Sequence, residues 1–203
     1  MFLFLKYLPK YLIVRISREK QTKTKWYFHK KSVSYYINKT HVDSFVNALR
    51  EVTFTAMFSP THHLIARKAF LYLTFLNGEI MLPPLVDKLN ESITSLIEPD
   101  RYTKLLSCAV AVAREMTIYS PEHALHTQLY VIPLLSAVLP GIDPNDSNKS
   151  MLTFEFIDTI LSNIIVCDCS HALHVRSDLS EHEKELIFQT IKFEDFIHEL
   201  LDK

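Results

Sequence analysis

Signals that start α-helices recur along this chain at similar intervals, and they constrain its fold more than any other feature. Four pairs of residues combine a helix N-cap or first-turn residue with proline: Ser59 with Pro60, Pro83 with Pro84, Pro99 with Asp100, and Ser120 with Pro121. Proline is tolerated at the first helical position because its missing amide would have no partner there. Helices that start about every 20 residues therefore fill most of the chain.

The spacing of these signals predicts seven helices after residue 41. We expect Gly78 to close the second helix, and we expect Pro133 to kink the fifth by removing an internal hydrogen bond. Ser180 and Glu183 form a capping box that opens the last helix. The expected helices span about residues 42–58, 60–77, 83–97, 99–119, 121–138, 148–166 and 180–203.

Glycine is nearly absent, since Gly78 and Gly141 are the only two among 203 residues. Nucleotide-binding βαβ folds need several glycines where the backbone approaches phosphate, and all-β folds use them in tight turns. The long runs of Leu, Ile, Phe and Ala instead favour a helical chain.

Pairs of the expected helices repeat at about 40 residues, which is the period of HEAT and armadillo repeats. Two helices share the spacing of their polar positions: His63, Arg67 and Thr74 in one, and Thr103, Ser107 and Arg114 in the other. Within each helix, nearly all positions between these polar residues are apolar. Both helices should therefore be covered on two sides, as stacked repeats are. The predicted fold class is all-α, an α-solenoid of HEAT/armadillo-like helical pairs.

Residues 139–157, which read LPGIDPNDSNKSMLTFEFI, predict a helix end, a loop and a helix start. We expect Gly141 in the left-handed conformation that ends helices, Pro144 in an extended one, and Asp146 as the N-cap of the next helix. The loop over 143–148 is the best candidate for a contact surface, because loops commonly carry binding. The alternative is a plain connection between two helices.

Positive charge is concentrated in the first 50 residues, which hold eleven Lys and Arg against two acidic residues. We therefore expect a basic N-terminal segment with a helix and a loop over 1–40, followed by HEAT-like helical repeats over 41–203 that form part of a larger solenoid. With Trp26, Tyr27 and Phe28 interleaved, the basic cluster could contact nucleic acid or another acidic surface. A solvated loop explains it more simply, and we expect no direct nucleic-acid binding. Its basic side chains are Arg15, Arg18, Lys20, Lys23, Lys25, Lys30 and Lys31.

The three cysteines are too few for a disulfide scaffold and indicate a reducing, intracellular compartment. The apolar opening over 1–14 is interrupted by Lys6, Pro9 and Lys10, and it lacks the basic region and cleavage site of a signal peptide. It is also too short and too charged to span a bilayer. We expect it to form part of a helix pair whose other half could lie outside this sequence, with no membrane partner.

The densest group of potential metal ligands is Cys167, Asp168, Cys169, His171 and His174. Zinc needs about four nitrogen or sulfur donors at tetrahedral corners, and this segment could supply them. However, no second pair lies at the separation of common zinc motifs. We expect a loop with two partly buried thiols, and we keep a metal site as the alternative.

Histidines near helix starts and scattered acidic residues are the remaining candidates for catalysis. Nucleophilic catalysis needs a Ser or Cys on a strained turn, a base within reach and an oxyanion hole, and no local stretch encodes this arrangement. We therefore assign no catalytic, cofactor-binding or metal-binding residues and no cofactor, and expect no enzyme. The candidates considered are His62, His63, His123, His126, Glu115, Glu122 and the acids of the last helix.

The stretch over 139–157 resembles a segment of the very large HEAT-repeat proteasome activators, the proteasome activator complex subunit 4 family. The similarity extends upstream through NGEIMLPPLVDKL at 77–89 and downstream through the acidic run at 179–203. Residues before about 61 match only weakly. The resemblance thus covers roughly the last two thirds of the chain.

The resemblance implies a structural portion of a helical dome that caps the 20S proteasome and stimulates its peptidase activity without ATP. It implies degradation of peptides and acetylated histones, roles in the DNA damage response and spermatogenesis, and a nuclear and cytoplasmic location. The implied partners are the 20S end ring and acetylated histones. Family members contact the ring through a tail with a penultimate tyrosine, which residues 198–203 do not match. None of the family's functional residues falls on a position of this sequence.

Two alternatives belong to other functional classes. An α-solenoid adaptor, such as a nuclear transport-type scaffold, should show recurring acidic or Trp/Asn positions on a concave face, and Trp26 is the only tryptophan. A metal-dependent helical enzyme would require Cys167, Cys169, His171 and His174 to converge.

Overall fold

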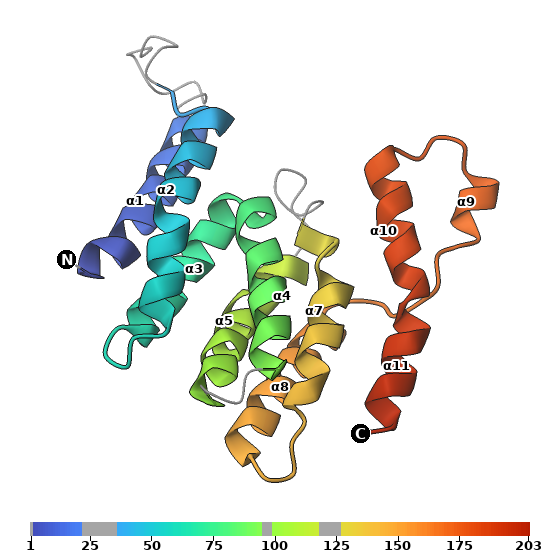
Figure 1. Ribbon diagram of the computed structural model, residues 1–203. Helices are drawn as coiled ribbons and strands as arrows, with labels where there is room; N and C mark the ends of the chain where they lie inside the picture. Colours follow the sequence, from blue (N-terminus) through green and yellow to red (C-terminus); the bar gives the residue numbers. More distant parts are fainter. Residues whose placement is uncertain (1, 22–35, 95–98, 118–126) are drawn as a thin grey trace. The chain divides into compact units, whose positions relative to one another are not determined.

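The computed structural model describes residues 2–21, 36–94, 99–117 and 127–203 (Figure 1). Across these ranges the regular structure is helical, and no strand occurs in them. The all-α prediction is therefore confirmed for this part of the chain. The chain divides into two compact units, Met1–Met81 and Leu82–Lys203. The expected division at residue 40 stays a prediction.

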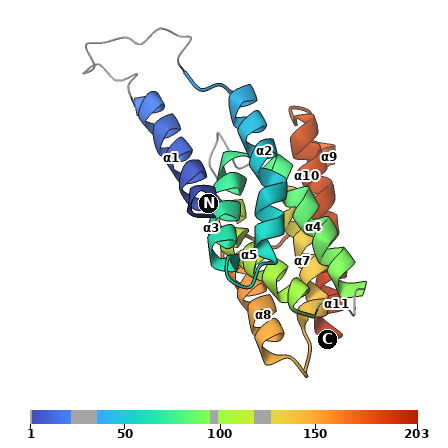
Figure 2. The ribbon, with the colours of Figure 1, turned by 60° about the vertical axis from the view of Figure 1, so that its left-hand side comes forward.

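The first unit is built around α3 (His63–Leu76), which packs against both α1 (Phe2–Gln21) and α2 (Lys39–Met57) (Figures 1 and 2). Phe54 of α2 and Phe70 of α3 meet edge to face, with their ring centroids 5.6 Å apart. The apolar opening belongs to a helix pair, as expected, but its partner is α3 of this chain and does not lie outside the sequence.

Asn77 lies between α3 and the helix that follows it, and it corrects the expected role of Gly78. The Asn77 backbone is extended and ends α3, while its Oδ1 atom accepts a hydrogen bond from the Ile80 amide at 3.3 Å. Its Nδ2 atom donates to Asp43 Oδ1 of α2 at 2.7 Å. Gly78 therefore begins α4 (Gly78–Thr94), and Pro83 and Pro84 lie inside that helix instead of starting it.

The expected start at Ser59 and Pro60 is also wrong, because a turn precedes α3, which begins only at His63. The Ser59 carbonyl accepts from the amides of His62 and His63, at 3.3 and 3.1 Å. Ser59 Oγ lies 3.0 Å from His62 Nδ1. Ser59 thus stabilises the turn between α2 and α3.

The second unit is built around α5 (Pro99–Thr117), which packs against α7 (Val131–Val138) and α8 (Ser147–Leu161). The short 3-10 helix η2 (Leu139–Gly141) directly follows α7. The expected covering of α5 on two sides is confirmed, since buried side chains occupy most of its turns. They include Tyr102, Leu105, Leu106, Cys108, Ala109, Val112, Ala113 and Met116.

α3 is likewise covered on two sides, by α1 and α2, but less completely than α5. In α3, Leu64 is 69% exposed and Phe75 is 41% exposed. Of the polar positions that share a spacing, Thr74 and Ser107 are buried. The Ser107 hydroxyl donates to the Lys104 carbonyl of its own helix at 2.8 Å. The polar positions that share a spacing therefore differ in their exposure.

Pro133 lies in the first turn of α7, where its missing amide has no helical partner, so the expected kink is wrong. The expected start at Ser120 and Pro121 lies outside the described residues. α8, which was expected to extend to residue 166, ends at Leu161 and is followed by the short α9 (Ala172–Val175).

The predicted last helix is divided at Lys192 into α10 (Glu181–Ile191) and α11 (Phe193–Leu201), which follow one another in Figure 1. The predicted capping box is confirmed: Glu183 Oε2 accepts from the Ser180 amide at 2.8 Å, and Ser180 Oγ accepts from the Glu183 amide at 3.3 Å. α11 contacts α7, and Phe193 and Phe196 are its buried side chains. In the described ranges, no helix combines the length and the apolar character needed to cross a bilayer.

Two phenylalanines of α8 provide a matched test of this packing. Phe156 is fully buried, whereas Phe154 is 52% exposed. We predict that Phe156→Ala lowers the free energy of unfolding by about 3–5 kcal/mol, because it leaves a cavity in the core. Phe154→Ala should lower it by less than about 1 kcal/mol. Urea denaturation followed by circular dichroism measures both, and equal losses would contradict the placement of α8.

Candidate functional site

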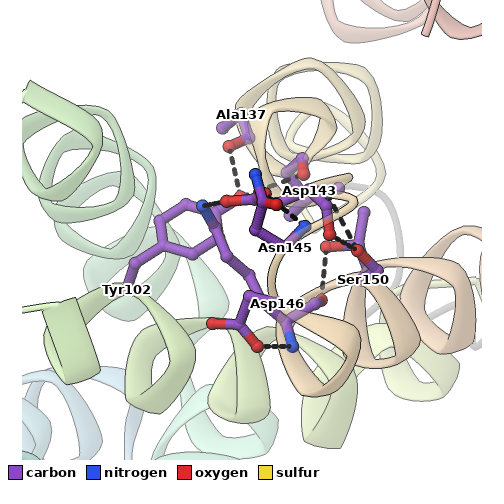
Figure 3. A network of polar contacts seen from close by, with 9 residues as sticks. Tyr102, Ala137, Asp143, Asn145, Asp146 and Ser150 are labelled. Atoms are coloured by element: carbon purple, nitrogen blue, oxygen red, sulfur yellow. Dashed lines mark hydrogen bonds and ion pairs between the residues drawn. The ribbon is translucent and has the colours of Figure 1, made fainter.

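The loop over 143–148, expected as a contact surface, begins where η2 rests against α5. Tyr102 of α5 is buried, and its hydroxyl donates to the carbonyls of Val138 and Ala137 at 2.9 and 3.3 Å (Figure 3). Both carbonyls belong to the end of α7, where helical acceptors lack partners within the helix. Tyr102 therefore satisfies the end of α7 and attaches it to α5.

Burial raises the pKa of the Tyr102 hydroxyl well above its ordinary value. The hydroxyl consequently stays protonated and keeps donating to the backbone throughout the physiological pH range. Its role is to position the chain before the loop.

Gly141 is not in the left-handed conformation that we expected, since neither glycine has a positive φ. It ends η2 and lies directly beside two side chains. A Cβ atom at this position would collide with Thr153 Oγ1 and would lie 3.0 Å from the Tyr102 hydroxyl oxygen. Glycine is needed here for close approach between the backbone and its neighbours.

Hydrogen bonds within the loop fix its backbone. The Asp146 amide donates to the Asp143 carbonyl at 3.1 Å, which places Pro144 and Asn145 in the middle of a turn. The expected extended role of Pro144 is therefore wrong, because proline also suits the second position of a turn. The Asn145 amide donates to Asp143 Oδ1 at 2.9 Å.

Asp146 is the N-cap of α8, as predicted. Its backbone is extended, and its Oδ1 atom accepts from the Lys149 amide at 2.9 Å. Ser150 adds a second attachment, because its Oγ atom accepts from the Asp143 amide at 2.9 Å and donates to the Asp143 carbonyl at 2.7 Å (Figure 3). The start of α8 and the loop thus form one hydrogen-bonded network.

Lys149 connects this network to α5. Its Nζ atom lies 5.1 Å from the ring centroid of Tyr102 and 3.6 Å from Asp143 Oδ2. A lysine over an aromatic face is attracted by the ring quadrupole. The ammonium group therefore bridges the loop and the helix on which the loop rests.

The resulting site is suited to binding, because the loop is held in one conformation before any partner arrives. The residues from Pro144 to Asn148 are exposed, while Asp143, Lys149 and Ser150 are partly buried. A preorganised surface loses little conformational entropy when it binds. The carboxylates of Asp143 and Asp146 already accept backbone hydrogen bonds, so they stabilise the turn and the start of α8.

The histidines considered for catalysis stand apart from this network. His62 Nδ1 lies 2.6 Å from Thr61 Oγ1, and His63 Nδ1 lies 3.2 Å from the Met57 carbonyl, so both contact the turn that leads into α3. Glu115 lies on α5 and is partly buried. Glu122, His123 and His126 lie outside the described residues, and the acids of α10 and α11 line a largely exposed surface.

Four of the potential metal ligands lie in the segment that joins α8 to α9, and the fifth, His174, lies in α9 itself. The four are Cys167, Asp168, Cys169 and His171. Within the described ranges, no three His, Cys, Asp or Glu side chains come together in a way that could hold a metal ion. Cys167 is exposed and Cys169 partly exposed, so the expectation of two partly buried thiols holds only for Cys169. Their Sγ atoms lie 3.5 Å apart.

The basic cluster is described only in part. Arg15, Arg18 and Lys20 lie on α1, and Arg15 Nε is 3.0 Å from Glu19 Oε1. The other members, between residues 22 and 31, lie outside the described residues. The expectation of no direct nucleic-acid binding therefore stays a prediction.

Tyr102, Lys149 and Thr153 give the site its shape, and the sequence alone does not single them out. Each has an ordinary helical environment in the sequence, and their neighbours in space come from other helices. The signal that could have found them is Gly141, since glycine is so rare in this chain.

Comparison with known families shows where similar sequences occur. The family model described as "Proteasome activator complex subunit 4, mid HEAT repeats region" matches residues 1–201. The match includes the first 60 or so residues, which we expected to match only weakly. An α-solenoid of HEAT-like helical pairs is accordingly the fold class of the chain.

Individual relatives agree with this match. The chain is 37% identical over 199 residues to proteasome activator complex subunit 4 from Xenopus laevis and 35% identical over 199 residues to the Homo sapiens protein. It is 35% identical over 196 residues to subunit 4B from Danio rerio. Each alignment covers 97% of this chain but only 10–11% of the relative, so the chain spans about a tenth of its relatives' length.

The close approach at Gly141 predicts the effect of a single methyl group. Gly141→Ala should lower the free energy of unfolding by about 1–3 kcal/mol, because the new Cβ collides with Thr153 Oγ1. Adding Thr153→Ala should recover part of the loss, which a double-mutant cycle would measure. Additive losses would show that the two residues are not in contact.

The N-cap of α8 supports a second prediction with a neighbouring control. Asp146→Ala should lower the free energy of unfolding by about 1 kcal/mol, because the Lys149 amide loses its acceptor. Asn145→Ala should have a smaller effect, since Asn145 contributes its backbone amide to the network. Chemical denaturation measures both variants, and a larger effect of Asn145→Ala would contradict the assigned cap.

Proposed function

Because the chain belongs to the proteasome activator complex subunit 4 family, we propose that it is a structural HEAT-repeat portion of an ATP-independent activator that caps the 20S proteasome. The observation that carries this proposal is the family match over residues 1–201. The helical packing supports it, because α5 is covered on two sides in the way that stacked helical repeats require.

The finer parts of the proposal follow the resemblance. The full-length protein would contact the end ring of the 20S particle and promote the degradation of peptides and acetylated histones. It would act in the nucleus and the cytoplasm, in the response to DNA damage and in spermatogenesis. The support for these roles is the similarity to relatives that are named as proteasome activator subunits.

In this proposal the chain contributes shape and rigidity. The attachment of η2 to α5 through Tyr102 holds the connection between two helices, and the loop over 143–148 presents a fixed, exposed turn. Such a turn is a surface to which a neighbouring protein can dock without ordering it first.

The other functional classes receive less support. An adaptor unrelated to the proteasome would share the helical period, but the family match favours the activator. A metal-dependent enzyme would need the donors of the segment after α8 to converge, and the described side chains there do not form such a group.

A chimeric protein tests the proposal directly. In the Xenopus laevis relative, the segment that aligns with this chain would be replaced by the chain itself. The chimera should bind purified 20S particles and stimulate their hydrolysis of peptides, because the segment would restore the helical array. Native electrophoresis measures binding, and release of a fluorogenic peptide measures stimulation.

The relative without the segment is the negative control, and the unmodified relative is the positive control. Within the chimera, Phe156→Ala should reduce stimulation more than Phe154→Ala, because only Phe156 lies in the core. A soluble, folded chimera that fails to bind the 20S particle would refute the proposal. Recovery of a different partner in a pulldown from cell extract would favour the adaptor.

A further inference from the structure

Two cysteine thiols face each other in the segment between α8 and α9. Cys167 is exposed, Cys169 is partly exposed, and their Sγ atoms are 3.5 Å apart. In an extended segment, side chains two residues apart point to the same side, which explains why the thiols meet. The third cysteine, Cys108, is fully buried within α5.

Neighbouring hydrogen bonds hold this segment in place. The Cys169 amide donates to Thr190 Oγ1 of α10 at 3.1 Å, and the Thr190 hydroxyl donates to the Ile187 carbonyl at 2.7 Å. The Asp168 carboxylate accepts from the Ser170 amide at 2.7 Å and from the Ser170 hydroxyl at 2.8 Å. The backbone around the thiols is therefore fixed on both sides of Cys169.

We propose that Cys167 and Cys169 form a dithiol site that exchanges with low-molecular-weight disulfides of the glutathione type and closes to an intramolecular disulfide. The site is independent of the proposed function. Its substrates are a small disulfide in the oxidising direction and a small thiol in the reducing direction.

The exchange proceeds in two balanced steps. The Cys167 thiolate attacks one sulfur of the small disulfide, so a mixed disulfide forms and the first small thiol leaves with the proton that Cys167 gave up. Cys169 then loses its proton and attacks the sulfur of Cys167, which forms the Cys167–Cys169 bond and releases the second small thiol. Two electrons pass from the protein dithiol to the small disulfide.

The surroundings of the thiols favour this order. Cys167 is the more exposed and can meet a small disulfide first. The hydrogen bond with the Cys167 thiol raises the pKa of Cys169, with burial as the next cause, so Cys169 is the poorer first nucleophile. Because its sulfur is already adjacent, Cys169 is well placed for the second, intramolecular step.

A redox titration of the full chain tests the proposal. The protein would be equilibrated in buffers of varied reduced and oxidised glutathione, quenched with acid, and alkylated with N-ethylmaleimide before peptide mass spectrometry. The peptide with Cys167 and Cys169 should lose two hydrogens as the buffer becomes more oxidising, and dithiothreitol should reverse the loss. Buried Cys108 is the internal control, and it should be alkylated only after unfolding.

Two single variants separate the two steps. Cys169→Ser should stop at the mixed disulfide, raising its amount at least about tenfold over the unmodified chain, because no second thiol displaces the glutathione. Cys167→Ser should slow formation of the first mixed disulfide about tenfold, since the remaining thiol is less exposed and has a raised pKa. Circular dichroism checks that both variants are folded.

The proposal would be overturned if the unmodified chain accumulated mixed disulfides on both cysteines without the internal bond. It would also be overturned if the cysteines formed disulfides only between chains. Unchanged rates in Cys167→Ser would refute the assigned first nucleophile.

Discussion

The contact between Gly141 and the side chains of Tyr102 and Thr153 is the constraint on which the second unit depends. The chain that leaves α7 passes through η2, directly against α5, before the turn from Asp143 to Asp146 leads it into α8. Tyr102 fills the space that a larger residue at position 141 would need, and its hydroxyl binds the last carbonyls of α7. Three helices thereby meet at one residue without a side chain.

The burial of α5 by neighbouring helices follows from this arrangement. α7 and α8 both pack on α5, so its apolar positions are buried over several turns, as a helix within a repeat array should be. The first unit uses a similar plan, with α3 between α1 and α2, but leaves Leu64 and Phe75 of α3 exposed. Membership of a family of much longer HEAT-repeat proteins accounts for a chain built from helical pairs.

Two short connections of this fold use polar groups in different ways. The loop over 143–148 turns its carboxylates back onto its own backbone, so that Asp143 and Asp146 stabilise a turn and a helix start. The segment after α8 fixes its backbone through Asp168 and Thr190 and leaves two thiols beside each other. The first arrangement provides a rigid surface, and the second provides reactive groups.

The sequence by itself determined the helical fold class and the helix starts that depend on neighbouring residues. Asp146 and the pair Ser180 and Glu183 are caps as predicted, because a cap requires only a side chain and amides within the next turn. Tertiary structure decided where such local signals were ambiguous. Gly78 can end a helix or begin one, and Asn77, bonded to Asp43 of another helix, precedes the start of α4.

The same distinction explains the site. Gly141 is visible in the sequence as one of two glycines. A glycine is needed at this position because Tyr102 and Thr153 approach it from two other helices. No local pattern encodes that approach, because it depends on how α5 and α8 pack. The sequence pattern of the last predicted helix likewise does not show the break at Lys192. After this break, α11 contacts α7. Sequence therefore determined which segments are helical, and packing between distant segments decided what their connecting residues do.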